Sequence, residues 1–508
     1  MQISERGAAT GPGTGAVVSA AVAVLSLFIL VVAVFTGLPL LEVSAAAAAL
    51  TIAAVGYKTM LQWHALIAFT ILVILFIPIK RYRMPGDLPF ELEPYRVVVA
   101  LVAACWFTSL LIDPRVRLRR TGFEGPILLF VVAAIGSVLA NGERIELLGV
   151  NAKVVKELTF FATFFLVTYL IASLIRERGK VDLLLKVLVV GGAAVALISI
   201  YESRTGVNLF DRLRVLPFLQ PVEGVEVETR GGRFRAFGSA QHPIALGAAL
   251  SMLFPLAVYL AVGLRRRRWW IAAGVLAIGA LAPVSRTAVL MAVTTLVVFL
   301  WLRPRETRKA WPVLLPAVIA VHLILPSTIG SLRASFFPEG GLIANQSQSV
   351  GSRGQGRIAD LSPALGEFSE RPVLGQGFGT RVVDGENPNA QILDNQWLKS
   401  LLEIGAVGAI SILWLFLRAI RRLAHRAKRD DDPRTGWLCV ALTASITAFA
   451  VGMLTFDAFA FIQVTFLLFI VLGFAAGLVS RPLPVADPRS RTAKPPRFPV
   501  VTTSAESH

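Results

Sequence analysis

The chain changes from polar to apolar at Asp394–Gly408, which reads DNQWLKSLLEIGAVG. Before it, a polar segment extends from Ser327 to Leu393. After it, and through most of the rest of the chain, uncharged apolar runs alternate with short charged connections, and the runs are long enough to cross a bilayer as helices. One long polar segment among such runs indicates a loop that covers a site at a membrane surface.

The composition indicates the same class of protein. Of the 508 residues, 55% are hydrophobic, and the mean hydropathy is +0.68. Soluble domains are usually about 45–50% apolar and have a mixed pattern. We therefore expect an all-α polytopic membrane protein with about 12–14 transmembrane helices.

A formal net charge of +18 would suggest a nucleic-acid partner in a soluble protein. Here most basic residues stand at the ends of apolar runs, as the positive-inside rule describes, so we expect no nucleic acid among the partners. Cys105 and Cys439 lie inside apolar runs, which predicts neither a disulfide framework nor a metal site. The sequence has no nucleotide-binding fingerprint, and we expect no cofactor.

The apolar runs divide the chain into five regions. We expect a cytoplasmic lead at 1–15, transmembrane helices over 16–326 with a medium outer loop at 202–241, a large extracytoplasmic loop at 327–394, further helices over 395–479, and a disordered cytoplasmic tail at 480–508. The predicted spans are Ala16–Gly37, Leu38–Val55, Leu61–Ile79, Tyr95–Ile112, Gly125–Ala140, Val154–Ile175, Val181–Tyr201, Pro243–Val262, Ile271–Val284, Ala288–Leu302, Pro312–Pro326, Trp397–Leu417, Trp437–Thr455 and Phe459–Leu478.

Loop charge predicts the orientation. The segments expected in the cytoplasm are Arg176–Lys180, Arg265–Arg268, Arg303–Lys309 and Arg418–Arg434. Lys80–Arg83 and Arg115–Arg120 flank one span, and both are basic, so one of them must face outward. We place Arg115–Arg120 inside. The loops 202–241 and 327–393 and the turn at Ser285–Thr287 then share the outer face.

Arginines mark this outer face. Guanidinium groups bind phosphate oxygens bidentately, so Arg233, Arg235 and Arg286 suit an anionic headgroup such as a diphosphate. Arg233 and Arg235 could equally belong to an ordinary solvated loop. Arg286 stands alone between two apolar runs, where an arginine requires a partner or a ligand.

Asp394 has two interpretations. It can act as a general base that takes a proton from an attacking hydroxyl, or it can cap the helix that follows. Asn395 can orient a substrate or form the cap instead. Glu403 lies deeper in the same run, where we prefer a structural pairing. For the glycines of Gly375–Gly379 we prefer turns with positive φ over a phosphate cradle.

Several separated motifs resemble, in the same order, the O-antigen ligase and polysaccharide polymerase superfamily of bacterial membrane proteins, and most closely its actinobacterial members. They are Leu88–Arg96 (LPFELEPYR), Arg233–Gly238 (RFRAFG) with His242-Pro243, Ser285–Ala288 (SRTA), Arg371–Gly379 (RPVLGQGFG), Asp394–Leu398 (DNQWL) and Glu403–Gly405 (EIG). The resemblance covers the chain from Leu88 to the last span. It implies a fold similar to GT-C-type glycosyltransferases.

The resemblance also implies an activity. It is that of a metal-independent glycosyltransferase in the cell membrane, with its active site facing outward, an undecaprenyl-diphosphate-linked glycan as donor, and a lipid- or wall-linked glycan as acceptor. In this family, arginines that match Arg235 and Arg286 hold the donor diphosphate, and Arg357 is a further candidate contact. A histidine–asparagine pair stands in the ligases where this chain has Asp394-Asn395.

These observations together predict two sets of site residues. Asp394 and Arg286 are the catalytic candidates, and Arg235, Arg233, Arg357 and Asn395 are the substrate-binding candidates. The predicted function is a cell-surface polysaccharide polymerase or an O-antigen-ligase-like enzyme. The alternatives are a transporter or flippase for lipid-linked glycans, and a non-catalytic scaffold for polysaccharide assembly.

Overall fold

A computed structural model describes most of the predicted membrane region. The described residues are 62–85, 93–114, 116–216, 219–222, 229–230, 233–326, 328–337, 361–381 and 394–480. The predicted lead, the first two spans, most of the large outer loop, the tail beyond 480, and Arg357 lie outside these residues.

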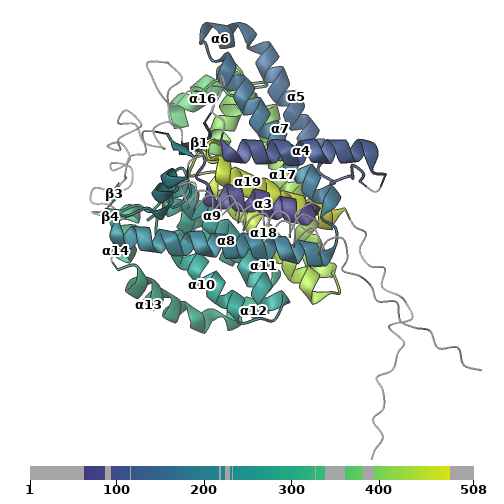
Figure 1. The fold of residues 1–508 in the computed structure, drawn as a ribbon. Coiled ribbons are helices and arrows are strands. Elements are labelled where there is room, and N and C mark those ends of the chain that lie inside the picture. Colours follow the sequence, from purple (N-terminus) through teal and green to yellow (C-terminus); the bar gives the residue numbers. More distant parts are fainter. Residues whose placement is uncertain are drawn as a thin grey trace, which may run out of the picture.

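The described part of the chain is built almost entirely from helices, which confirms the predicted all-α class (Figure 1). The long helices are α3 (Trp63–Phe76), α4 (Pro94–Ile112), α5 (Glu124–Ala140), α7 (Asn151–Leu174), α8 (Arg178–Thr205), α9 (Pro243–Gly263), α10 (Arg268–Leu281), α11 (Arg286–Leu302), α13 (Leu314–Ile324), α17 (Gln396–Arg429), α18 (Pro433–Gly452) and α19 (Ile462–Val479). Short helices are α6 (Gly142–Leu147), α12 (Pro304–Lys309), α14 (Thr328–Phe336) and α16 (Leu361–Glu370), with single turns η1 (Leu209–Val215), η2 (Trp311–Val313) and η3 (Ala458–Ala460).

Strands in the described residues are short pairs. Antiparallel β1 (Tyr82–Arg83) and β2 (Gln220–Pro221) form one, and antiparallel β3 (Thr229–Arg230) and β4 (Arg233–Phe234) form the other. Both pairs tie connecting segments together and leave the helical core untouched.

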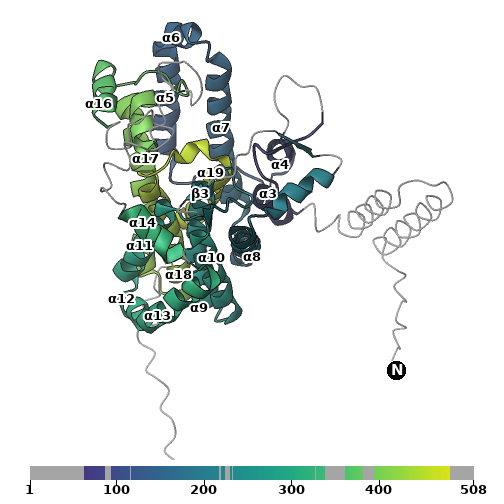
Figure 2. The ribbon, with the colours of Figure 1, turned by 90° about the vertical axis from the view of Figure 1, so that its left-hand side faces the viewer.

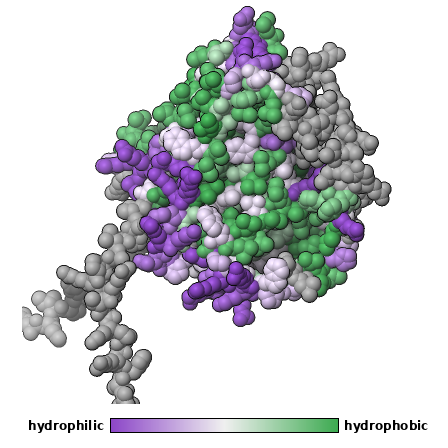
Figure 3. Space-filling view, turned by 180° about the vertical axis from the view of Figure 1, so that it is seen from behind, coloured by the Kyte–Doolittle hydropathy of each residue, from purple (hydrophilic) through white to green (hydrophobic). Residues whose placement is uncertain are grey.

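The chain is a multi-pass membrane protein. Among the described helices, α4, α7, α8, α9, α17, α18 and α19 are long and apolar enough to cross a bilayer. The shorter apolar helices α3, α5, α10 and α11 pack among them. Apolar side chains cover much of the surface in Figure 3, as expected where lipid is the solvent.

The predicted span at Pro312–Pro326 ends in a sharp bend. The structure has η2 and α13 there, followed by α14 at an angle of 99°. Pro326 stands at the break, and proline has no amide hydrogen with which to continue a helix.

Helices α9 and α19 form the centre of the bundle, because 94% and 89% of the residues in their apolar 18-residue stretches are buried. Helix α4, at 22%, lies at the periphery. Phenylalanines join α7 to α19, because the Phe164 ring stacks on Phe469 at 5.2 Å and meets Phe466 edge-on at 4.8 Å. These rings fix the positions of the helices that carry the site.

Helix α17 is broken inside its apolar run. Gly405 adopts φ 64° and ψ −169°, which interrupts the helical hydrogen bonds. The glycine-rich segment, Pro372–Gly379, fills the break. Backbone hydrogen bonds join the two: Gln376 N–H to Leu402 O (2.8 Å), Gly377 N–H to Glu403 O (3.2 Å), Ala406 N–H to Pro372 O (2.8 Å) and Val407 N–H to Val373 O (3.3 Å). The freed backbone groups are therefore satisfied within the membrane region.

Two glycines make this close approach possible. A Cβ on Gly405 would lie 2.2 Å from Val373 O, and a Cβ on Gly375 would lie 2.6 Å from Leu402 O. Gly375, Gly377 and Gly379 all have positive φ, which agrees with the turn interpretation of this motif.

Helix α17 also runs beyond the predicted end of its span at Leu417, as far as Arg429. The expected loop is helical because its arginines find partners on other elements. Arg418 Nε donates to Gly122 O (2.5 Å) and Arg426 Nη1 to Leu478 O (2.5 Å).

The bundle has two distinct ends. At the Arg286 end, β1 pairs with β2, and Arg81 Nη1 donates to Gly238 O (2.9 Å), so Lys80–Arg83 lies beside the 202–241 loop. At the Asp432 end, Arg178 pairs with Asp432, and Arg303 Nη2 donates to Ala427 O (2.8 Å). The four basic segments expected in the cytoplasm gather at this second end, where Gly263 lies against Arg434, and residues 116–120 join them through Gly122.

Candidate functional site

Two of the arginines selected from the sequence meet at the Arg286 end. Arg235, directly after β4, is buried, and its Nε donates to Pro283 O at 3.2 Å. Arg286, three residues after Pro283, is the first residue of α11, and it is half-buried. The structure thus brings both guanidinium-bearing segments to the positive N-terminus of α11.

The turn after α18 connects α11 to the head of α17. Thr287 Oγ1 and Thr455 Oγ1 are 2.8 Å apart, and Gln396 N–H donates to Met453 O (2.8 Å) and Phe456 O (3.2 Å). Asp394 and Asn395, both half-buried, directly precede Gln396. Asp394 and Arg286 therefore belong to one connected region.

Asn395, rather than Asp394, caps α17. Its Oδ1 accepts the Leu398 N–H at 3.2 Å. The capping interpretation of Asp394 is therefore wrong, because the position next to it in the chain already supplies the cap. Asp394 directly precedes the cap, at the N-terminal end of α17.

Strained backbone occurs beside both catalytic candidates. Among the described residues, those other than glycine with positive φ are Lys80 (62°), Arg265 (52°), Val284 (51°) and Asp394 (46°). A β-branched residue such as Val284 is a pronounced outlier there, and each such residue costs about 1–3 kcal/mol. Strain of this kind concentrates at functional sites, and here it directly flanks Asp394 and the Arg286 turn.

Glu202, in the last turn of α8, positions the Arg235 segment. Its carboxylate accepts Gly238 N–H (2.8 Å) and Phe237 N–H (3.2 Å), and it also accepts Asn208 Nδ2 (3.1 Å). Glu202 was predicted to lie in the 202–241 loop, without a role. An acidic residue at the end of an apolar run, before an arginine-rich loop, was the available signal.

A charged pocket lies just below the head of α17. Lys399 Nζ pairs with Asp457 Oδ2 at 2.9 Å, and Glu403 Oε1 accepts Arg381 N–H at 3.3 Å. The cavity measures about 20 Å³, which is enough for a water molecule. Its polar lining is Glu157, Gln396, Lys399, Ser400 and Glu403.

The preferred interpretation of Glu403 as a paired residue agrees with this pocket, since Lys399 lies beside it on α17. Lys399 and Asp457 were missed. The four-residue spacing of Lys399 and Glu403 was a usable signal, because such residues share one helix face. The contact of Lys399 with Asp457 joins segments that are far apart in the chain, so no local sequence pattern predicts it.

Residues 273–413 match the family model described as O-antigen ligase. This segment belongs to the O-antigen ligase superfamily. No curated protein matches the chain. The O-antigen ligase segment extends from α10 into α17, and it contains both Arg286 and Asp394. The protein is therefore a multi-pass membrane protein that contains a segment similar to O-antigen ligases.

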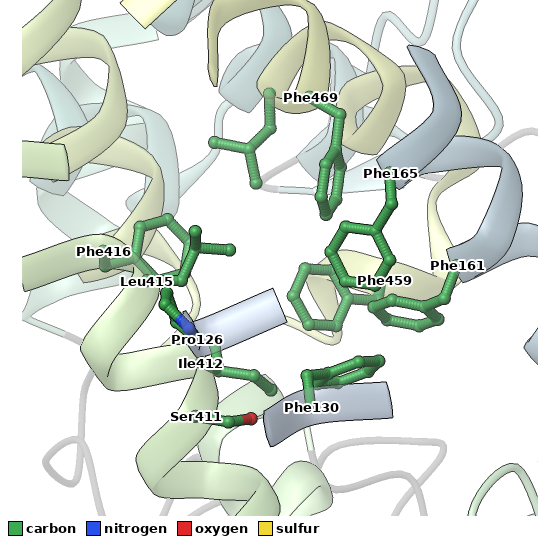
Figure 4. Close-up of a pocket in the computed structure, with 11 residues that line it drawn as sticks. Pro126, Phe130, Phe161, Phe165, Ser411, Ile412, Leu415, Phe416, Phe459 and Phe469 are labelled. Atoms are coloured by element: carbon green, nitrogen blue, oxygen red, sulfur yellow. The ribbon is translucent and has the colours of Figure 1, made fainter. Parts of the chain in front are cut away.

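The O-antigen ligase segment also borders an apolar cavity of about 10 Å³ (Figure 4). Phe130, Phe161, Phe459 and Ile412 line both this cavity and the charged pocket. The site region thus passes directly from charged groups to aromatic rings.

Two substrate-binding candidates receive less support. Arg233 contributes its backbone to β4, opposite Arg230, and its side chain lies outside the described part of the structure. Arg357 lies outside it altogether. His242 caps α9 by accepting Ile244 N–H at Nδ1 (3.1 Å), so its position at the start of that helix is structural.

Proposed function

We propose that the protein transfers or polymerises glycans from an undecaprenyl-diphosphate-linked donor onto a hydroxyl acceptor, at the outer face of the cell membrane. One observation carries the proposal. The O-antigen ligase match contains Arg286 and Asp394, and the Thr287–Thr455 and Gln396–Met453 hydrogen bonds hold their segments together at one end of the bundle.

In this proposal, Arg235 and Arg286 bind the donor diphosphate. A planar guanidinium matches two phosphate oxygens, and the N-terminus of α11 adds partial positive charge. As the bond between the sugar and the diphosphate breaks, negative charge grows on the leaving oxygen. Positive groups fixed in advance lower the free energy of that transition state. No metal ion is required for this role.

Asp394 is the proposed general base. Its carboxylate takes the proton of the acceptor hydroxyl, whose oxygen forms the new bond to the anomeric carbon. The anomeric carbon–oxygen bond breaks, and its electron pair leaves with the lipid diphosphate. Asp394 then releases the proton to water. Asn395 keeps the carboxylate in place by capping α17.

The main alternative is a transporter of lipid-linked glycans, and the break at Gly405 favours it, since broken helices line many transport sites. Here, however, the glycine-rich segment occupies the break and bonds its backbone groups. The polar groups also collect at one end of the bundle. Both features favour chemistry at a surface over a path through the membrane.

The test compares the wild-type protein with Arg286→Ala and Asp394→Asn in liposomes that contain a lipid-diphosphate-linked repeat. We expect each variant to insert and unfold like the wild type but to lose at least about 100-fold in transfer rate. Arg308→Ala, at an exposed position near the Asp432 end, is the matched control. Full product from the Asp394→Asn variant would reject Asp394 as the base, whereas no product from the wild type would support the scaffold alternative.

A further inference from the structure

A second group of cations gathers at the Arg286 end, apart from Arg235 and Arg286. Lys80 follows α3, Arg96 lies in the first turn of α4, and Lys156 lies near the start of α7. The Phe160 ring stands between two of them, with Arg96 Cζ 5.4 Å and Lys156 Nζ 5.9 Å from its centroid. We call Lys80, Arg96 and Lys156 the cation patch.

Glu93 organises the patch. Its Oε1 accepts the Lys80 N–H at 2.6 Å, and its Oε2 lies 3.0 Å from Arg96 Nε. Lys80 holds a positive φ in this arrangement. Glu93 is buried, whereas Lys80 and Lys156 are exposed. The exposed surface of the patch is therefore positive.

The elements below the patch are apolar. Helices α4 and α7 both begin here, so their N-termini add partial positive charge at the level of the cations. Farther along, α3, α4, α7 and α19 are apolar and enclose a small pocket of about 20 Å³ lined by Ile67, Ile71, Val99, Val102, Leu166 and Leu170, among others. A positive surface above apolar, membrane-spanning helices complements an amphiphile with an anionic head.

The patch adjoins the charged pocket across α7. Figure 2 shows α3 and α4 on one side of α7, and α5 with α17 on the other. Lys156 is on the patch side of α7, while the adjacent Glu157 lines the pocket with Lys399. Asp394 lies two residues before Gln396, which also lines this pocket.

We propose that the cation patch binds the phosphate group of a lipid-linked acceptor, while Arg235 and Arg286 hold the donor. This inference rests on the proposed function and deepens it. Two lipid-linked phosphates held at the same end of the bundle as Asp394 present the acceptor hydroxyl and the donor anomeric carbon to the same carboxylate. A phosphate-free acceptor gains nothing from the patch.

The experiment separates donor from acceptor. Phosphatidylcholine vesicles contain a polyprenyl-diphosphate-linked repeat as donor. The acceptor is the same repeat either on a polyprenyl phosphonate, which cannot act as donor, or as a phosphate-free alkyl glycoside. The double variant Lys80→Gln, Lys156→Gln is compared with the wild type and with Lys309→Gln, an exposed lysine of α12.

We expect the double variant to raise KM for the phosphonate acceptor about ten-fold or more, with unchanged KM for the donor and the alkyl glycoside. Lys309→Gln should match the wild type. Equal changes for both acceptors, or a rise in donor KM, would overturn the inference. Phosphatidylglycerol added to the vesicles should not change the KM of the wild type for the phosphonate acceptor. If it raised that KM to the value of the double variant, the patch would be a general phospholipid site and the inference would also be overturned.

A binding measurement decides the inference without catalysis. Native mass spectrometry of the wild type with the polyprenyl phosphonate should show a bound lipid that the double variant loses and that Arg286→Ala retains. If the wild type shows no transfer to either acceptor, the proposed function fails, and this binding result still tests the patch. Equal binding by wild type and double variant would reject it.

Discussion

The two ends of the bundle use the same residue types in different ways. At the Asp432 end, arginines pair with carboxylates or carbonyls of neighbouring helices: Arg178 with Asp432, Arg434 with Asp182, and Arg303 with Ala427 O. At the Arg286 end, cations gather around a polar pocket, beside strained backbone at Val284 and Asp394. Ion pairs such as Arg96–Glu93 and Lys399–Asp457 occur at this end too, so the polar pocket and the strained backbone distinguish it, rather than its arginine content.

Removing Arg235 should have the largest effect on activity. Arg235→Ala leaves the α11 N-terminus without its neighbouring guanidinium, so we expect transfer to fall by about 100- to 1,000-fold. Because Arg235 is buried against Pro283 O, Arg235→Lys is the sharper variant, since it keeps the charge and loses the planar fork. Initial rates in liposomes measure both. Wild-type rates from Arg235→Lys would show that the geometry of this cation is unimportant.

Breaking the Asp432 end should lower stability instead. Asp182 is buried, accepts Tyr259 Oη–H at 2.5 Å and pairs with Arg434. Asp182→Ala leaves both partners unsatisfied, which should cost about 3–5 kcal/mol of folding free energy. Thermal unfolding in detergent measures the loss. Transfer per folded molecule should stay at the wild-type level, and a selective loss of activity would contradict the distinction between the two ends.

The break in α17 offers a third comparison, between glycines in different surroundings. Gly405→Ala meets Val373 O and an unfavourable φ, so we expect about 2–4 kcal/mol of destabilisation. Gly274→Ala in α10, where no atom lies within 4 Å of the added carbon, should stabilise slightly, by about 0.5–1 kcal/mol. Equal unfolding temperatures for the two variants would show that the glycine-rich segment does not need to approach α17 so closely.

The smallest effect is expected at Asp432, the cap of α18. Partial burial opposes its ionisation, but hydrogen bonds from Thr435, the Arg434 amide and Arg178 lower the pKa of Asp432 to about 2. A depressed carboxyl pKa adds stability above the unfolded pKa of about 3.9, and that stability is lost as the pH falls toward 2. Asp432→Ala should cost about 1 kcal/mol at pH 7. The difference from wild type should shrink below pH 4, and a constant difference would exclude the carboxylate as its origin.

Much of the fold follows from the sequence because lipid imposes simple rules. Uncharged runs gave the positions of most helices, and loop charge correctly grouped the basic segments at one end. The bend after α13 and the extension of α17 were not predicted. Both depend on local breaks or on arginine partners from other helices, which hydropathy does not register.

Only part of the candidate site could be predicted from the sequence. Arg235, Arg286 and Asp394 stood out because they are polar residues at the edges of apolar runs. The Glu202 network, the Lys399–Asp457 pair and the cation patch each join segments far apart in the chain. Only the packing of α7, α8 and α17 brings them together. At the start of α17, the local sequence allowed either Asp394 or Asn395 to cap the helix, and in the structure Asn395 is the cap.

Reconstitution of the wild-type protein tests the central claim most directly. The purified chain in liposomes would receive a lipid-diphosphate-linked repeat on the face that carries Arg286 and Asp394, without nucleotide or added metal, and products would be identified by gel and mass spectrometry. The account predicts new glycosidic bonds together with released lipid diphosphate. A ladder of products would identify a polymerase, and transfer only to an added acceptor would identify a ligase. Movement of the intact lipid-linked glycan across the bilayer, with no new bond, would contradict the account in favour of transport.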